Sequence, residues 1–252
     1  MRGRSIPLSR PRILVCDLLH FAAGIPTVPV QRRMYLGDLV AARAAHPDRP
    51  SWTAIFTKAF ALVSADMAPL RRAYVKFPWA RLYEYERPVA SVAIEREYRG
   101  EPAVFMNRLR CPNEMTLGEL SRQLRDASTT PLEDVKAFRR SLRICGLPKV
   151  VRRLAWWIGL NSPKKRIRYF GTFGVSVYSA LGAESLHPLA PLTTLLNYGV
   201  LSPNGEVDVR LIYDHRVLDG ATVARALARL EDVLTTTIVE ELRADNSIRS
   251  AA

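Results

Sequence analysis

The stretch YDHRVLDGA (213–221) places a histidine four residues before an aspartate, and a glycine follows that aspartate directly. Before it, GEVDVRLIYDHR (205–216) alternates apolar and polar side chains, which predicts a half-buried strand. From Ala221 onward, apolar residues recur at spacings of four, three and four, which predicts a helix. His215 therefore stands where a strand ends, and Asp219 stands where a helix begins.

His215 and Asp219 admit two interpretations. A histidine can accept a proton near neutral pH, so His215 could deprotonate a thiol or hydroxyl from a rigid position. Aspartate is also a favoured N-cap residue, so the Asp219 carboxylate could instead accept a hydrogen bond from the backbone amide of Thr222. The spacing alone does not decide between a catalytic site and an ordinary helix start.

Two other segments predict helices with recognisable starts. SWTAIFTKAFALVSADM (51–67) is typical of a buried helix, and Ser51 can cap it. Thr116 followed by Glu119 fits a capping box and indicates a second helix.

Strands are predicted in three further places. Residues 88–98 and 103–110 favour a hairpin that turns at Gly100. FGTFGVSVYSALG (170–182) is rich in strand-forming residues, and PLTTLLNYGVL (191–201) is a second apolar strand candidate. Together with the helices, these strands predict a mixed α and β protein.

The composition limits the class of protein. The chain has 252 residues, of which 48% are hydrophobic, enough for one large core or two small ones. We expect no signal peptide and no membrane span, because no run of 18 apolar residues occurs. Cys16, Cys111 and Cys145 are widely spaced and form no metal pattern with the four histidines. We therefore expect a reducing, cytoplasmic location and no bound metal.

The formal net charge of +13 favours anionic partners. Nucleotide phosphates, anionic lipid, acidic proteins and nucleic acid all fit such a charge, and a solvated arginine-rich surface explains it equally well. The sequence shows no helix-turn-helix, zinc or RNA-recognition signature, so we expect no nucleic-acid partner.

The segment GLPKVVRRLAWWIGL (146–160) predicts a basic amphipathic helix. One face is apolar and consists of Val150, Leu154, Trp157 and Leu160. The other is basic and consists of Lys149, Arg152 and Arg153. The simpler interpretation packs the apolar face into the core and leaves the basic face in solvent. The alternative is a helix that contacts a membrane surface or a partner.

The opening stretch also resembles the DHRxxDG signature of the dihydrolipoamide acyltransferases, the core enzymes of 2-oxoacid dehydrogenase complexes, in the chloramphenicol acetyltransferase-like superfamily. Further segments agree in order: WTAIFTKAFALV is similar to the family's first core helix, FGTFGVSVYSALG to its GTFTISNLG strand, and PLTTLLNYGV to its following apolar strand. The resemblance spans roughly residues 25–243 and is loose through 131–168.

This resemblance implies an α+β fold of the chloramphenicol acetyltransferase type, a two-layer sandwich in which helices flank a mixed sheet. It also implies a trimer whose active site lies in a channel between subunits. The expected domains are a basic N-terminal arm (1–24) that is disordered over its first twelve residues, a catalytic domain (25–243) and a polar tail (244–252). We expect no lipoyl or subunit-binding domain. Because the tail is polar, we expect a free homotrimer.

The resemblance assigns a role to each candidate site residue. His215 would be the general base that deprotonates the attacking thiol, hydroxyl or amine. Ser176 aligns with the residue that hydrogen-bonds the tetrahedral oxyanion, although Thr172 and Ser179 lie close enough to be alternatives. Asp219 matches the motif aspartate, which holds the site in shape, commonly through an arginine. Coenzyme A or acyl-coenzyme A would be the substrate, with no lipoyl group on this chain.

The sequence departs from the family pattern in two places. Val177 and Gly174 replace the asparagine and the threonine that flank the motif serine, and residues 131–168 have no clear counterpart. Within that block lies the basic run KKRIR (164–168). One interpretation is that its side chains bind the phosphates of coenzyme A, and the other is that it forms a solvated loop. The basic residues are Lys164, Lys165, Arg166 and Arg168.

The identities of the acyl acceptor and of any partner stay open. The acceptor could be a small amine or alcohol, a lipid, or the thiol of a lipoyl or carrier protein supplied in trans. The competing hypothesis is a catalytically inactive trimeric scaffold or ligand-binding protein of the same fold.

Overall fold

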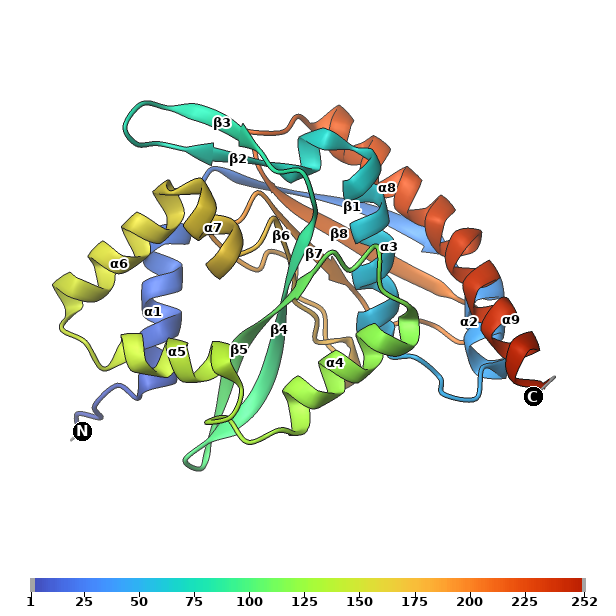
Figure 1. The fold of residues 1–252 in the computed structure, drawn as a ribbon, viewed down its shortest axis with the longest axis horizontal. Coiled ribbons are helices and arrows are strands. Elements are labelled where there is room, and N and C mark those ends of the chain that lie inside the picture. The colour runs from blue at the N-terminus through green and yellow to red at the C-terminus, as the bar shows by residue number, and fades with distance from the viewer. Residues whose placement is uncertain (1–2, 251–252) are drawn as a thin grey trace.

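A six-stranded mixed sheet with the strand order β1-β8-β7-β6-β4-β5 organises the molecule, as seen in Figure 1. The computed structural model describes residues 3–250. The strands of this sheet are β1 (Thr27–Tyr35), β4 (Val89–Tyr98), β5 (Glu101–Arg110), β6 (Phe173–Val175), β7 (Thr194–Tyr198) and β8 (Glu206–Asp214). A separate hairpin consists of β2 (Arg72–Val75) and β3 (Arg81–Glu84). The sheet is mixed because β6 runs parallel to both β4 and β7, whereas the other pairs are antiparallel.

Helices flank the sheet and bury one continuous apolar core. They are α1 (Arg10–Ala22), α2 (Gly37–Ala45), α3 (Trp52–Asp66), α4 (Leu117–Thr129), α5 (Lys136–Cys145), α6 (Lys149–Asn161), α7 (Pro163–Tyr169), α8 (Gly220–Thr235) and α9 (Thr237–Ser250). The core joins buried residues of α3, α4 and α8 to the strands. A smaller cluster on the sheet includes Leu195 and Ile212. The predicted α+β sandwich is confirmed.

Local sequence signals set several of these elements as predicted. The Ser51 hydroxyl accepts the backbone N–H of Ala54 at 3.1 Å and caps α3. Thr116 and Glu119 form the capping box that starts α4. The β4–β5 hairpin turns through Arg99 and Gly100 at φ values of 54° and 80°, where glycine is favoured because it has no Cβ.

Strand β8 is more deeply buried than the alternating pattern predicted. Leu211 and Tyr213 are buried on the core side, but Arg210 and Ile212 are also less than a tenth exposed. The prediction of a half-buried strand is wrong because the second cluster and the segment around Glu184 cover the other side. Strand β8 therefore buries two charged groups, the guanidinium of Arg210 and the carboxylate of Asp214. Each of them needs a partner.

Both predicted terminal segments contain helix. Helix α1 begins after Ser9, whose hydroxyl accepts the backbone N–H of Arg12 at 3.3 Å. The prediction of disorder is therefore wrong for Arg10–Arg12, because α1 packs against α5, β5 and α6. Met1 and Arg2 lie outside the described residues. Helix α9 continues through residues 244–250 of the predicted polar tail, and the last two residues again lie outside the description.

The favoured prediction for α6 is correct for the buried Leu160 and the exposed Lys149, but wrong for most of the predicted apolar and basic faces. Val150 is 79% exposed and Leu154 is 54% exposed. Its arginines instead face α1, where Asp17 is fully buried. Arg152 Nε donates to Asp17 Oδ2 at 2.8 Å, and Arg153 Nε lies 2.9 Å from Oδ1. The attraction of this buried carboxylate turns Arg152 and Arg153 toward α1. Val150 and Leu154 are left exposed, whereas Trp156 and Leu160 are buried. Within residues 3–250, no helix combines the length and apolarity that crossing a membrane requires.

Candidate active site

His215 occupies a fixed position directly after β8. Its backbone N–H donates to the carbonyl oxygen of Pro26 at 3.0 Å, which ties the turn to the segment before β1. Its side chain is exposed, and the imidazole ring lies 5.4 Å from the ring of Tyr213, centroid to centroid. Among the described residues the imidazole has no hydrogen-bond or ion-pair partner. The ring is therefore positioned by the backbone and free to exchange a proton with a substrate.

The residues on either side of His215 lock this turn. Asp214 is buried, and its two carboxylate oxygens accept hydrogen bonds from Arg216 Nε at 2.9 Å and Nη2 at 2.7 Å. The backbone N–H of Arg216 also donates to Asp214 Oδ1 at 3.0 Å. The guanidinium lies 4.3 Å from the ring centroid of Tyr74. Sequence reasoning assigned neither residue, although an acid and an arginine two residues apart could have suggested the pair.

Asp219 precedes α8 but does not cap it through its side chain. Its backbone carbonyl accepts the N–H of Val223 at 3.1 Å, whereas the carboxylate accepts no capping hydrogen bond. The interpretation that the carboxylate caps Thr222 is therefore wrong. The carboxylate is exposed, and no arginine of residues 3–250 forms an ion pair with it.

Ser176 lies one residue beyond β6. Its backbone N–H donates to Leu196 O at 3.1 Å, and its carbonyl accepts Asn197 Nδ2 at 2.5 Å. The hydroxyl has no protein partner within the described chain, so it can donate to a ligand. Gly174 explains one departure from the family pattern, because a Cβ there would lie 2.5 Å from Leu195 Cδ1. The neighbouring Leu195 occupies the space that a threonine would need.

The sheet keeps Ser176 and His215 apart within one chain. Ser176 follows Val175, which pairs with Leu196, and Leu196 pairs with Leu211 on β8. Two strand spacings across and five residues along therefore separate the two side chains, a distance of about 19 Å. Within one chain, Ser176 and His215 are therefore too far apart to contact the same ligand atom.

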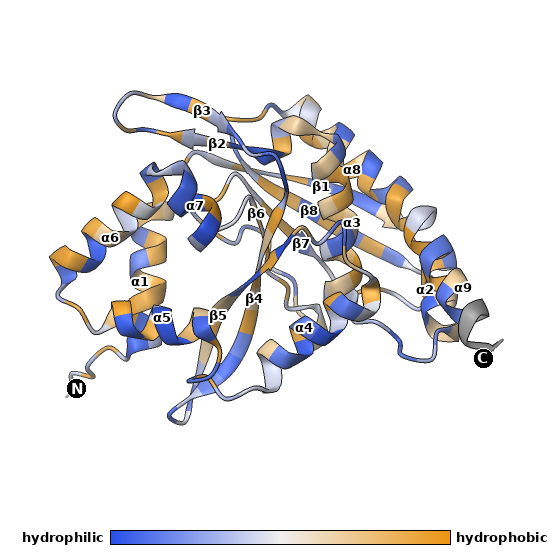
Figure 2. Ribbon diagram, in the orientation of Figure 1, coloured by the Kyte–Doolittle hydropathy of each residue, from blue (hydrophilic) through white to orange (hydrophobic). Residues whose placement is uncertain are grey.

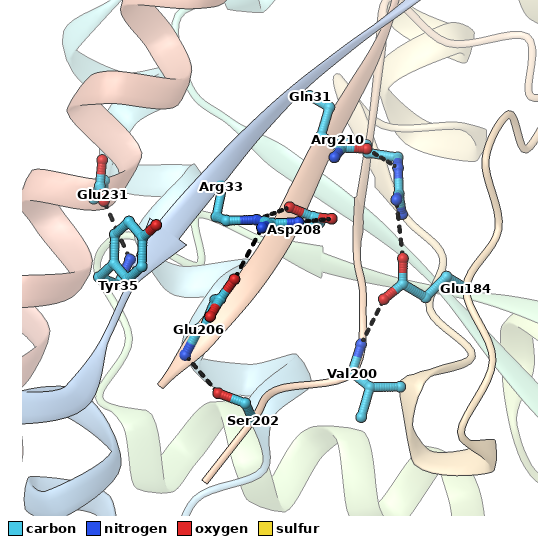
Figure 3. A network of polar contacts seen from close by, with 10 residues as sticks. All are labelled: Gln31, Arg33, Tyr35, Glu184, Val200, Ser202, Glu206, Asp208, Arg210 and Glu231. Atoms are coloured by element: carbon cyan, nitrogen blue, oxygen red, sulfur yellow. Dashed lines mark hydrogen bonds and ion pairs between the residues drawn. The ribbon is translucent and has the colours of Figure 1, made fainter. Parts of the chain in front are cut away.

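A polar network centred on the buried Arg210 holds the segment after Ser176 on the sheet (Figure 3). Arg210 lies level with Ser176, and its Nε donates to Gln31 Oε1 at 2.6 Å. Its Nη2 lies 2.9 Å from Glu184 Oε2, and Glu184 Oε1 accepts the backbone N–H of Val200 at 3.2 Å. Through Glu184, the network ties the middle of the loop between β6 and β7 to β8 and to the backbone that follows β7. No sequence spacing marked these residues.

A second histidine lies near the same end of the sheet. His187 Nε2 is 2.9 Å from Thr27 Oγ1, and Thr27 pairs with Asp214 in the β1–β8 ladder. No local pattern predicts that His187 lies at the end of the sheet that carries His215, because the pairing of β1 with β8 brings the two segments together.

The basic run 164–168 is only partly available to a ligand. Arg166 is buried and donates to the carbonyl oxygens of Leu160 at 3.4 Å and Pro191 at 3.1 Å. Burial lowers the pKa of Arg166, and these carbonyls satisfy its donors. Arg166 is therefore structural, which removes it from the expected phosphate-binding residues. Lys164, Lys165 and Arg168 remain exposed.

Comparison with solved structures places this fold among acetyltransferases. The cubic core of a pyruvate dehydrogenase multienzyme complex matches with a TM-score of 0.70 and 18% identity, over 94% of this chain and 93% of that chain. The same values relate the chain to a dihydrolipoamide acetyltransferase from Azotobacter vinelandii, studied for the role of a serine, a histidine and an asparagine in its catalytic mechanism. A chloramphenicol acetyltransferase matches with a TM-score of 0.52 and 14% identity, over 90% and 96% of the two chains.

The sequence itself is distant from characterised proteins. No family model matches it, and no curated protein matches it. At the identities found, the structural likeness establishes the fold. The resemblance found in the sequence is therefore confirmed for the chloramphenicol acetyltransferase-like architecture, with a match over more than nine-tenths of the chain.

Proposed function

We propose that the chain is a stand-alone, coenzyme A-dependent acyltransferase with His215 as its general base. The observation that carries the proposal is the free imidazole held on the end of β8 by its own backbone and by the Asp214–Arg216 pair. A scaffold of the same fold would need neither a free imidazole nor a bidentate pair beside it. The acetyltransferase fold supports the same conclusion.

The proposed reaction transfers an acyl group between a thioester and a nucleophile. His215 removes the proton from the attacking thiol, hydroxyl or amine, which then forms a bond to the thioester carbonyl carbon. Ser176 of a neighbouring chain donates a hydrogen bond to the carbonyl oxygen as negative charge develops on it. The tetrahedral intermediate breaks its carbon–sulfur bond, and the departing thiolate takes the proton from the imidazolium. Within residues 3–250, no cluster of side chains could hold a metal ion, and the proposed reaction uses none.

The separation of Ser176 from His215 predicts activity only in an oligomer, which we propose is a homotrimer. Each single variant, Ser176→Ala and His215→Ala, should lose transfer. A co-expressed mixture of the two should recover it, because random assembly pairs an intact serine with an intact histidine at about one interface in four. The measurement is release of thiol from acetyl-coenzyme A, with dihydrolipoamide and a panel of amines and alcohols as acceptors.

The matched control is the double variant Ser176→Ala/His215→Ala, whose mixture with itself cannot recover activity. If the mixture of single variants stays as inactive as this control, although gel filtration shows mixed oligomers, the shared site is wrong. Activity in a monomer would contradict the proposal in the same way.

We also propose that α6 contacts the surface of an anionic membrane. Its outward side presents Val150, Leu154 and Trp157, and the Trp157 ring lies 5.1 Å from the ring of Phe77, which is itself 54% exposed. Lys149 lies exposed at the start of the helix. This combination of exposed apolar and basic side chains is typical of interfacial helices. The acceptor in that case would be a lipid.

Vesicle binding tests this surface. The protein should co-sediment with phosphatidylglycerol vesicles, and Val150→Asp/Leu154→Asp should abolish the binding without lowering the melting temperature, because both side chains are exposed. The control Leu181→Asp/Leu186→Asp adds the same charge to leucines that are 72% and 68% exposed elsewhere. Equal binding by all three proteins would remove α6 as the contact.

A further inference from the structure

A cleft between β5, α5 and α7 gathers five basic side chains and a single acidic one. It has a volume of about 490 Å³. We call it the α5–α7 cleft. Its basic lining residues are Arg108, Arg110, Lys136, Arg140 and Arg168. Asp134 is the single acid in the lining. Figure 2 shows the hydrophilic stretches of α5 and α7 that contribute these side chains.

The basic groups of the α5–α7 cleft are unpaired. None of them forms an ion pair within residues 3–250, and neither does Asp134. Arg108 Nη1 donates to the carbonyl oxygen of Tyr169 at 3.1 Å, and the guanidiniums of Arg140 and Arg168 lie 5.0 Å and 5.7 Å from the Tyr169 ring centroid. Burial and the charges of Arg140 and Arg110 lower the pKa of Arg108. Like charges held together in this way are stabilised by a bound anion.

The sequence concentrates its charge in this region. Residues 135–183 hold eleven lysines and arginines and no aspartate or glutamate. Other members of that set have partners: Arg152 and Arg153 face Asp17, and Arg166 donates to carbonyl oxygens. The cleft therefore gathers five cations that have no ion-pair partner among the described residues. Lys136, Arg140 and Arg168 come from the block that has no clear counterpart in the family the sequence resembles, and Arg108 and Arg110 come from β5.

The position of the cleft relates it to His215. Val89 lines the cleft, and the next residue, Ala90, is aligned with Phe173, Thr194 and Tyr213 across the sheet. The cleft and His215 thus lie toward the same end of the strands. Three strand spacings separate β8 from β4 and four separate it from β5, which is about 14 Å and about 19 Å. Such a separation suits an elongated ligand with phosphates at one end and a reactive group at the other.

We propose that the α5–α7 cleft binds the phosphate groups at the nucleotide end of coenzyme A, an inference that rests on the proposed function. Arginines suit this role because the planar guanidinium donates paired hydrogen bonds to phosphate oxygens. The cleft has the volume of a site for one small ligand. A membrane surface or a nucleic acid would instead be met by an open, extended basic surface.

Calorimetry with adenosine 3′,5′-bisphosphate tests the cleft without requiring catalysis. The wild-type protein should bind this nucleotide and coenzyme A, and the affinity should fall as salt is added. Arg140→Ala/Arg168→Ala should weaken both by at least about tenfold, because charge-assisted hydrogen bonds are lost. The matched control Arg122→Ala/Arg125→Ala removes two exposed arginines from α4 and should bind as wild type does.

The outcomes separate the cleft from the proposed reaction. Equal nucleotide affinity in the cleft variant and the control would overturn the cleft and leave acyl transfer standing. Nucleotide binding lost only in the cleft variant, with no transfer by the wild type, would support the cleft and oppose the reaction. If the wild type binds no nucleotide, and the cleft variant loses only binding to phosphatidylglycerol vesicles, the cleft serves lipid and the proposal is wrong.

Discussion

Replacing His215 with alanine should lower acyl transfer by about 100-fold to 10,000-fold, the contribution typical of a general base. The imidazole is exposed and contacts the rest of the chain through the Tyr213 ring, so its removal leaves the core unchanged. The turn keeps its backbone bond to Pro26 and the Asp214–Arg216 pair. The variant should therefore fold, assemble and bind acyl-coenzyme A as the wild type does.

The measurement combines calorimetric titration with acetyl- and longer acyl-coenzyme A, transfer rates and thermal melting. His187→Ala is the matched control, because it removes an exposed imidazole from the same end of the sheet and should retain most of the activity. Saturable binding by both proteins with transfer lost only in His215→Ala establishes the base. Unchanged transfer in His215→Ala would contradict that role. Absence of binding by the wild type as well would favour the scaffold.

The sequence predicted best those parts of the fold that depend on neighbouring residues. The caps at Ser51 and Thr116, the turn at Gly100 and the helix after Asp219 all follow from residues within one turn of each other. A local hydrogen bond or backbone angle specifies the two caps and the turn, and the apolar spacing specifies the helix after Asp219.

The failures share a cause, which is a partner far away in the chain. The basic face of α6 turns inward because Asp17 lies 135 residues before Arg152. Asp17 is itself in a segment whose helix the sequence did not indicate. Strand β8 is buried on both faces because the loop that carries Glu184 folds over Arg210. An amphipathic pattern shows that one side of a helix or strand is apolar and the other is polar. Which side is buried depends on tertiary contacts.

The candidate site shows the same limit. The motif located His215 and Asp219, and the short FGTFGVS segment located Ser176. Their separation follows from the sheet order β6-β7-β8, which no local pattern contains. The α5–α7 cleft likewise joins arginines of β5, α5 and α7 that lie up to 60 residues apart. The sequence therefore identifies candidate site residues more readily than it predicts how the fold brings them together.

Replacing Asp17 with alanine should have the largest effect on stability, about 3–5 kcal/mol of unfolding free energy, because it leaves two partly buried arginines without their counter-charge. The Asp17 side chain is 1% exposed, and those of Arg152 and Arg153 are 12% and 22% exposed. Arg152 donates a hydrogen bond to the Asp17 carboxylate. Arg153 Nε lies close to the same carboxylate, but its N–H does not point at the oxygen well enough to form a hydrogen bond. Urea unfolding of the wild type and the variant measures the difference.

Asp66→Ala is the matched control. Its carboxylate pairs with Arg229 at side-chain exposures of 59% and 49%, so its loss should cost about 1 kcal/mol or less. A second variant, Asp17→Leu/Arg152→Leu/Arg153→Leu, separates charge from packing, because replacing all the charges should restore much of the stability. If the triple variant recovers stability but loses vesicle binding, the main role of the three charges is to orient α6 with Val150 and Leu154 exposed. Their contribution to the stability of the fold is then small. Equal stability of Asp17→Ala and Asp66→Ala would contradict both conclusions.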